Sequence, residues 1–147
     1  MNSNNKKLTN ESLQENKKIE SSIAFLQQEP TEEVLAHVLT VIRRSMKAHG
    51  QLIIAVEPPK GDGKINLQAI QTSDGKQWWS AFTSFDEELK GSDKIMSTFT
   101  ADIDKIFLSA LQEPSIEGVI INPWNRTIML NKTLISIKSC ITFSCFT

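Results

Sequence analysis

The sequence predicts an α+β domain in which helices pack on a mostly antiparallel sheet of about five strands. Two uninterrupted apolar runs, 52–56 and 118–121, have the length and composition of strands that are buried on both faces. Between two other strand-like runs, the Asp74-Gly75 pair favours a hairpin turn and therefore antiparallel neighbours. A segment at 31–47 carries apolar side chains at three- and four-residue steps, which is the pattern of a helix lying on a core.

Two helices are expected before the first strand. The first nine residues are polar, and Asn10 then caps a helix over 10–28 whose apolar stripe is thin. Thr31 caps the second helix, because its side chain can accept a hydrogen bond from a backbone N–H of the first turn. This helix has an acidic first turn and basic last turns, as the helix dipole favours, and it ends at His49-Gly50.

A β section follows the second helix. Strands at 51–57, 65–72 and 77–82 form a meander, in which the first connection is a Pro- and Gly-rich loop. The second connection is the Asp-Gly turn, for which a type I′ conformation is expected. Ser84 then caps a short helix, and Glu87 stands three residues later to complete a capping box.

The rest of the chain alternates strands and helices. A strand is expected at 94–99, and Thr100 is expected to cap the amphipathic helix that follows it. Strands at 118–121 and 127–130 flank an Asn-Pro-Trp corner, and a last helix begins at 132–137.

A chain of 147 residues is long enough for one domain with its own core. We expect a polar tail and helical extension over 1–30 and the α+β domain over 31–137. The remaining tail, 138–147, fits a short edge strand and an aberrant chain end equally well, so its structure stays open.

The charge balance excludes some classes of partner. The chain has 16 basic and 17 acidic residues and a net charge of −1, so it lacks the basic field of a nucleic-acid or anionic-membrane binder. No apolar run approaches the roughly 20 residues of a membrane-spanning helix, and no apolar block follows the basic N-terminus as in a secretory signal. We therefore expect a cytoplasmic protein with neither nucleic acid nor membrane as a partner.

No pattern predicts a catalytic residue, a cofactor or a metal site. The carboxylates of 86–88, and those of Asp102 and Asp104, are explained by their positions at helix starts. The chain has no G-x-S-x-G elbow, and the glycines of 60–64 are too close together for a phosphate-binding loop. Cys140 and Cys145 are expected to be free thiols, because the sequence places no further soft ligands beside them to complete a zinc site.

The Asn122-Pro123-Trp124 corner is the most distinctive local feature of the sequence. Pro123 fixes its own φ and excludes the preceding residue from the right-handed helical region. The Asn122 side chain can hydrogen-bond nearby backbone, and Trp124 adds a large ring beside the turn. The corner is therefore expected to be rigid.

The aromatic strand before the short helix allows two interpretations of the tryptophans. Trp78 and Phe82 should lie on one face of this strand, and Trp79 and Ala81 on the other. Either all three tryptophan rings fill the core, or Trp79 or Trp124 is partly exposed and anchors a partner. The candidate interaction surface comprises Trp79, Phe82, Thr83, Ser84, Asn122, Pro123 and Trp124.

Two segments resemble the N-terminal domain of the SseB family (enhanced serine sensitivity proteins), namely Trp78-Trp79-Ser80-Ala81-Phe82-Thr83-Ser84 and Ile121-Asn122-Pro123-Trp124. The resemblance covers 31–137 and rests on the order and spacing of the parts. It implies an α+β domain from a bacterial cytoplasm, with no established enzymatic activity or cofactor. The chain departs from the family at Trp79, where an aliphatic residue is more usual, and the resemblance does not extend to the function of any following domain.

Three functions are compatible with the sequence. The first is a non-enzymatic binding or regulatory module that contacts another protein through the candidate surface. The second is a protein or enzyme that binds a small amino-acid-related metabolite, which requires a concave pocket with polar groups such as Asn122 with Thr83 or Arg126. The third is a toxin-neutralising or secretion-linked partner protein.

Overall fold

The computed structural model describes residues 16–57, 61, 63, 66–90 and 97–139. In this part of the chain, five helices pack on a six-stranded, mostly antiparallel sheet, which confirms the α+β class. The helices are α2 (Asn16–Gln28), α3 (Glu32–Lys47), α4 (Phe85–Leu89), α5 (Ile103–Gln112) and α6 (Lys132–Ser139). The strands are β1 (Gln51–Val56), β2 (Ala69–Gln71), β3 (Gln77–Phe82), β4 (Ser97–Asp102), β5 (Gly118–Ile121) and β6 (Ile128–Asn131).

The sheet has the strand order β4-β1-β3-β5-β6, and β2 pairs with β3 beside this path. Only β3 and β5 are parallel, with Ala81 opposite Ile121, and the other described pairs are antiparallel. The two apolar runs of the sequence form β1 and β5, which both lie between neighbouring strands. This position explains why the central residues of β1 and the whole of β5 are buried on both faces.

The expected meander is only partly present. β1 pairs directly with the end of β3, where Ile53 lies opposite Phe82, and β2 pairs with the beginning of β3. In the described part of the chain, β1 meets this segment at one isolated bridge, from Val56 to Leu67, which lies before β2 begins. Residue 65 of the strand expected at 65–72 lies outside the described part of the chain, and among 66–72 only 69–71 form a strand. This strand is too short to flank the whole of β1, and the end of β3 pairs with β1 instead.

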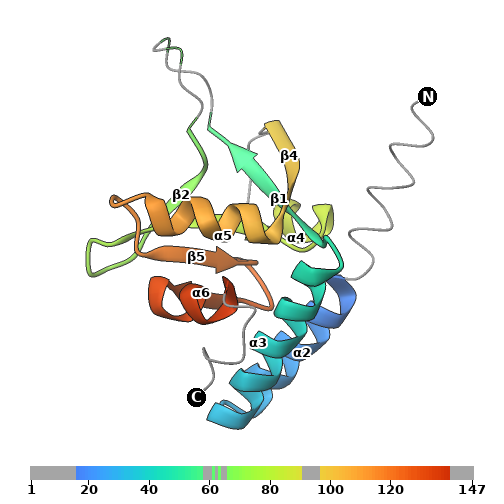
Figure 1. Cartoon of the computed structure of the whole chain (residues 1–147). Coiled ribbons are helices and arrows are strands. Elements are labelled where there is room, and N and C mark those ends of the chain that lie inside the picture. The colour runs from blue at the N-terminus through green and yellow to red at the C-terminus, as the bar shows by residue number, and fades with distance from the viewer. Residues whose placement is uncertain (1–15, 58–60, 62, 64–65, 91–96, 140–147) are drawn as a thin grey trace, which may run out of the picture.

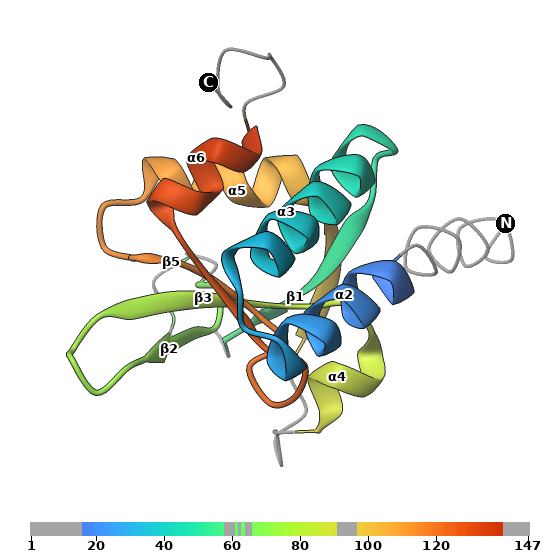
Figure 2. The same ribbon diagram turned by 90° about the horizontal axis from the view of Figure 1, so that it is seen from below.

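Two apolar layers enclose the sheet. Figure 2 shows α3, α5 and α6 on one side of the sheet, α2 beside α3 near the strand ends, and α4 on the opposite side. The main core lies under the large helices and includes Ile23, Ile42, Phe107, Ile121 and Leu130. The smaller cluster, on the side of α4, consists of Ile53, Ala55 and Phe82. The helix pair α2–α3 extends beyond the sheet in Figure 1.

The cap expected at Thr31 is confirmed, because its side-chain oxygen accepts a hydrogen bond of 3.2 Å from Val34 N–H. Ser84 likewise caps α4 by accepting a bond of 3.2 Å from Glu87 N–H. The cap expected at Thr100 is wrong. Thr100 pairs with Ile53 inside β4, which continues to Asp102 before α5 begins.

The place where α5 begins is explained by hydrogen bonds to residues at the start of β1. Asp102 occupies the N-cap position but makes no side-chain cap bond, since its carboxylate accepts a bond of 3.0 Å from the Gln51 side chain. Ile103 N–H instead donates to the carbonyl of Gly50, at 3.0 Å. The residues 94–96 of the expected strand lie outside the described part of the chain.

The hairpin between β2 and β3 is confirmed, but the expected type I′ turn is wrong. A type I′ turn needs positive φ at both central residues, and here only Gly75, with φ of 86°, has it. Gly75 N–H donates to Thr72, and Thr72 N–H donates to Lys76 across the loop, both at 2.9 Å. This is a three-residue loop in which a glycine in the left-handed region follows an ordinary turn.

Asp74 gives this turn a pH dependence. Its carboxylate accepts hydrogen bonds from the Thr72 hydroxyl and the Lys76 N–H, which lower the pKa of Asp74 below its usual 3.8. A carboxylate with a depressed pKa stabilises the fold above its unfolded-state pKa, and this contribution is lost as the pH falls through the folded-state pKa.

We expect Asp74→Ala to lower the urea midpoint at neutral pH. The difference from wild type should shrink below pH 3.8.

Asp74→Asn is the matched control, because an amide oxygen can accept the same two bonds without titrating. At neutral pH it should lose less stability than Asp74→Ala. Because neither variant titrates at this position, its difference from wild type should change with pH in the same way as that of Asp74→Ala. An Asp74→Ala difference that stays constant from neutral to acid pH would contradict the role given to the carboxylate.

Gly118 supports the packing of β5 against β6. A Cβ at this position would lie 2.0 Å from the carbonyl oxygen of Leu130 and 2.8 Å from Cα of Asn131, so the backbone of β6 would have to move.

We expect Gly118→Ala to lower the free energy of unfolding by about 2 kcal/mol or more. Chemical denaturation measures this loss. Glu117→Ala is the neighbouring control and should cost about 1 kcal/mol or less, because it removes only a surface ion pair with Lys76.

Candidate functional site at the Asn-Pro-Trp corner

Asn122 fixes the corner through its backbone. It follows β5 and has a φ of 55°, a left-handed conformation that Asn tolerates better than most residues. Its N–H donates to Ala81 at 2.8 Å and so extends the parallel pairing of β3 with β5. Its carbonyl accepts bonds from Asn125 N–H, at 3.3 Å, and from the Thr127 hydroxyl. The chain therefore turns sharply from β5 towards β6.

The Asn122 side chain joins the corner to the end of β3. Its Oδ1 accepts a bond of 2.9 Å from Thr83 N–H, and its Nδ2 donates a bond of 2.9 Å to Thr83 Oγ1. Both residues are fully buried. Thr83 directly follows the last residue of β3. Without the Asn122 side chain, the Thr83 N–H would be a buried donor with no acceptor.

The other polar groups of Thr83 reach helix α2. Its hydroxyl donates to Glu20 Oε2, and its carbonyl accepts a bond of 3.1 Å from Asn16 Nδ2. Asn16 Nδ2 also donates to the carbonyl of Gln51, at 2.7 Å, where β1 begins. Two side chains on successive turns of α2 therefore hold this helix to the ends of β1 and β3.

An ion pair closes this network on the surface. Arg126 Nη1 lies 3.2 Å from Glu20 Oε1, and the Arg126 side chain is 45% exposed. Since Arg126 belongs to the same corner as Asn122, α2 is tied to the corner directly and through Thr83. We call Asn16, Glu20, Thr83, Asn122 and Arg126 the corner network.

The corner network is a structural element rather than an open recognition site. A hydrogen bond between neutral groups contributes about 1 kcal/mol net, whereas a buried group left without a partner costs about 1–3 kcal/mol. Thr83 has partners for its N–H, its carbonyl and its hydroxyl, and Asn122 for both ends of its amide. Asn16 Oδ1 is a buried acceptor of the network without a hydrogen-bond partner.

The residues of the candidate interaction surface differ in accessibility. Phe82, Thr83 and Asn122 are buried, so they can support a contact surface but cannot present their side chains to a partner. Trp79 is half-buried against the main core, Pro123 is half-buried, and Ser84 caps α4. Trp124 is 41% exposed.

The strand faces expected for the aromatic residues are confirmed. Ala81 and Trp79 pack with the main core, and Phe82 belongs to the cluster on the opposite face. Trp78 is 8% exposed, and its ring N–H has no hydrogen-bond partner. The interpretation in which all three tryptophan rings fill the core does not hold, because Trp124 is exposed.

Helix α4 adds exposed apolar side chains next to the corner. Glu87 is buried, and its Oε1 lies 2.9 Å from Lys90 Nζ and accepts a weaker bond of 3.4 Å from Asn125 in the corner. Phe85 and Leu89, on the outer side of α4, are 46% and 66% exposed. We call Phe85, Leu89 and Trp124 the corner surface. They lie on two segments that start at the Thr83–Asn122 pair and that the Glu87–Asn125 bond joins.

Sequence reasoning did not identify Asn16 and Glu20 as part of the site. Their signal is the interrupted apolar stripe of α2, on which Ile19 and Ile23 are buried. Asn16 precedes these residues by three and seven positions and therefore lies on the same helix face. A buried polar residue at a core-facing position indicates a specific hydrogen-bond partner elsewhere in the fold.

Two cavities in the described part of the chain lie along α2 and α3, away from Asn122. They have volumes of about 540 and 650 Å³ and share the residues Phe25 and His37.

Among the described residues, no group of three or more His, Cys, Asp or Glu side chains is placed to hold a metal ion. Cys140 and Cys145 lie outside the described part of the chain.

Comparisons with known proteins add no identification. No protein-family model, curated protein or solved structure matches this chain. None of the described helices is long and apolar enough to cross a membrane.

Asn122 is the residue whose replacement should affect the corner most. We expect Asn122→Ala to lower the free energy of unfolding by about 3 kcal/mol, because it leaves Thr83 N–H unpaired and places an alanine in the left-handed region. Asn122→Gly loses the same bonds but adopts positive φ freely, so it should cost less than Asn122→Ala.

Asn125→Ala is the control from the same corner, since Asn125 is exposed and its side chain makes only the 3.4 Å bond to Glu87. Its effect should stay within about 0.5 kcal/mol. Urea denaturation of the variants measures these differences. An Asn122→Ala protein as stable as Asn125→Ala would show that the corner network does not hold the fold.

Proposed function

We propose that this protein is a non-enzymatic binding module that contacts another protein through the corner surface. The observation that carries the proposal is the position of Trp124. Trp124 is 41% exposed, two residues after Asn122, which is buried and hydrogen-bonded through its backbone and side chain. A tryptophan on a fixed support is the type of residue that most often dominates the energy of a protein interface.

Rigidity supports this role thermodynamically. Association with a partner loses free energy when side chains and loops must first become ordered. The corner is fixed by the Thr83–Asn122 pair and by the Glu20–Arg126 ion pair before any partner arrives. A contact made by Trp124 therefore carries a smaller ordering cost than one made by a tryptophan on a loose loop.

The distribution of apolar side chains also favours the corner. Of the seven large apolar side chains exposed in the described part of the chain, three belong to the corner surface. The others are Phe25, Phe99, Leu108 and Met129, on four different elements. The resemblance of 78–84 and of the corner to the SseB N-terminal domain favours a protein of the bacterial cytoplasm.

A capture experiment with matched surface variants tests the proposal. The bait is the full chain, and wild type is compared with Trp124→Ala/Leu89→Ser in lysates of cells that express it. The control is Leu108→Ser/Met129→Ser, which removes two comparably exposed apolar side chains from α5 and β6. We expect a protein that wild type and the control retain and the corner variant loses.

The purified partner then allows a direct measurement. Trp124→Ala alone should raise the dissociation constant of the complex with this partner by about 30-fold, which corresponds to a hot-spot residue of about 2 kcal/mol. Equal capture by all three baits, or an affinity within about threefold of wild type, would overturn the assignment of the corner surface. Circular dichroism and urea midpoints confirm that the variants are folded.

A further inference from the structure

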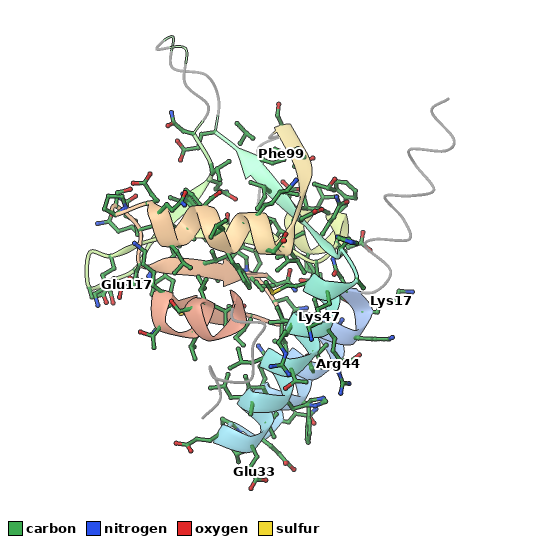
Figure 3. All side chains as sticks on the ribbon, in the orientation of Figure 1. Lys17, Glu33, Arg44, Lys47, Phe99 and Glu117 are labelled. Atoms are coloured by element: carbon green, nitrogen blue, oxygen red, sulfur yellow. The ribbon has the colours of Figure 1, made fainter. Side chains whose placement is uncertain are left out.

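A groove with opposite charges at its two ends runs along the α2–α3 hairpin. One part of it, of about 540 Å³, is lined by both helices, including Lys17, Lys18 and Arg44. The other part, of about 650 Å³, is lined near the turn of the hairpin by Glu29, Glu32 and Glu33. Figure 3 shows Lys17 and Arg44 towards one end of the helix pair and Glu33 at the other.

The centre of the groove is apolar and shared by both parts. Phe25, on α2, and His37, on α3, line both cavities, and Phe25 is 44% exposed. Val41 adds an apolar contact on the basic side. An apolar centre with charged groups at both ends matches the arrangement of protein interfaces, which have an apolar core and a polar rim.

We infer that this groove is covered by the groove of a second copy of the chain, related to the first by a two-fold axis that passes near Phe25. A two-fold axis places the same surface on both subunits and reverses its direction. The basic end of one copy then meets the acidic end of the other twice, and the two Phe25 rings meet near the axis. The groove is thus complementary to itself in charge.

Charge complementarity favours a second copy over other occupants. A small organic anion or an acidic peptide would satisfy only the end with Lys17 and Arg44 and would leave the three glutamates of the other end opposed by nothing. A second copy satisfies both ends with the residues that the chain already contains. This inference is independent of the corner surface and does not rest on the proposed function.

The size of the face predicts a weak, concentration-dependent dimer. α3 has 16 residues and is therefore about 24 Å long, and two helices side by side are about 20 Å wide. Such a face covers about 500 Å² per copy, or about 1,000 Å² in total, which is below the usual range of stable interfaces. The dimer should therefore form only towards high micromolar concentrations.

Two charge variants test the inference. Lys17→Glu/Arg44→Glu makes both ends of the groove acidic, and Glu32→Lys/Glu33→Lys makes both ends basic. Sedimentation equilibrium, from about 5 to about 500 µM, covers the affinity expected for an interface of this size. We expect wild type to dimerise, each variant alone to dimerise at least tenfold more weakly, and an equimolar mixture of the two to form a heterodimer.

The equimolar mixture distinguishes lost charge complementarity from a damaged fold. A misfolded variant would not regain association when it is mixed with the other variant. A chain with all four substitutions reverses the sign of both ends but keeps Lys18 and Glu29, so it should dimerise more strongly than either charge variant alone and more weakly than wild type. Phe25→Ser should weaken the dimer at least tenfold, whereas Leu108→Ser, on α5 outside the groove, should leave it unchanged. Trp124→Ala should also leave it unchanged, which separates this inference from the proposed function.

Three results would overturn the inference: a wild type that stays monomeric over the whole range, charge variants that dimerise like wild type, and a mixture that does not associate. A wild-type monomer whose groove binds a different protein, or an organic anion, with the same charge dependence would assign the groove to that occupant and would equally overturn it.

Discussion

The paired hydrogen bonds between Asn122 and Thr83 are the interaction on which the rest of the structure depends. They join the ends of β3 and β5, which are the only parallel neighbours in the described sheet and are far apart along the chain. The helix α4 starts from the Thr83 side of this pair, and the turn to β6 starts from the Asn122 side. Through Glu20 and Asn16 the same pair also positions α2. A change at this point therefore affects one turn and two helices.

The sequence was sufficient for the elements whose signals are local. The apolar run of β1, the Thr31 cap and the Ser84 cap all arise from residues within one or two turns of each other, and all are confirmed. The start of α5 could not be predicted in this way. Thr100 is a good cap residue, but the pairing of β4 with β1 extends the strand past it, and the partner residues lie about 50 positions away in the chain.

The site was predicted in part for the same reason. Asn122 and Thr83 were identified from the unusual residues around them, yet their burial and mutual hydrogen bonds depend on how β3 and β5 are paired. Asn16 and Glu20 were not identified, because their partners lie 35 to 106 residues away and only the folded chain brings them together. Helix α2, which the sequence presented as an extension, is hydrogen-bonded to the ends of two strands.

The exchange of the Thr83 amide proton with solvent tests this account most directly. Thr83 N–H lies just beyond β3, and its acceptor is the Asn122 side chain, so its protection reports whether the pair is formed in solution. If the pair holds the fold together, this amide exchanges as slowly as amides of the buried strand β5, through global unfolding of the protein. Exchange at the rate of exposed loop amides, with β5 still protected, would show that the pair opens locally and would contradict the account.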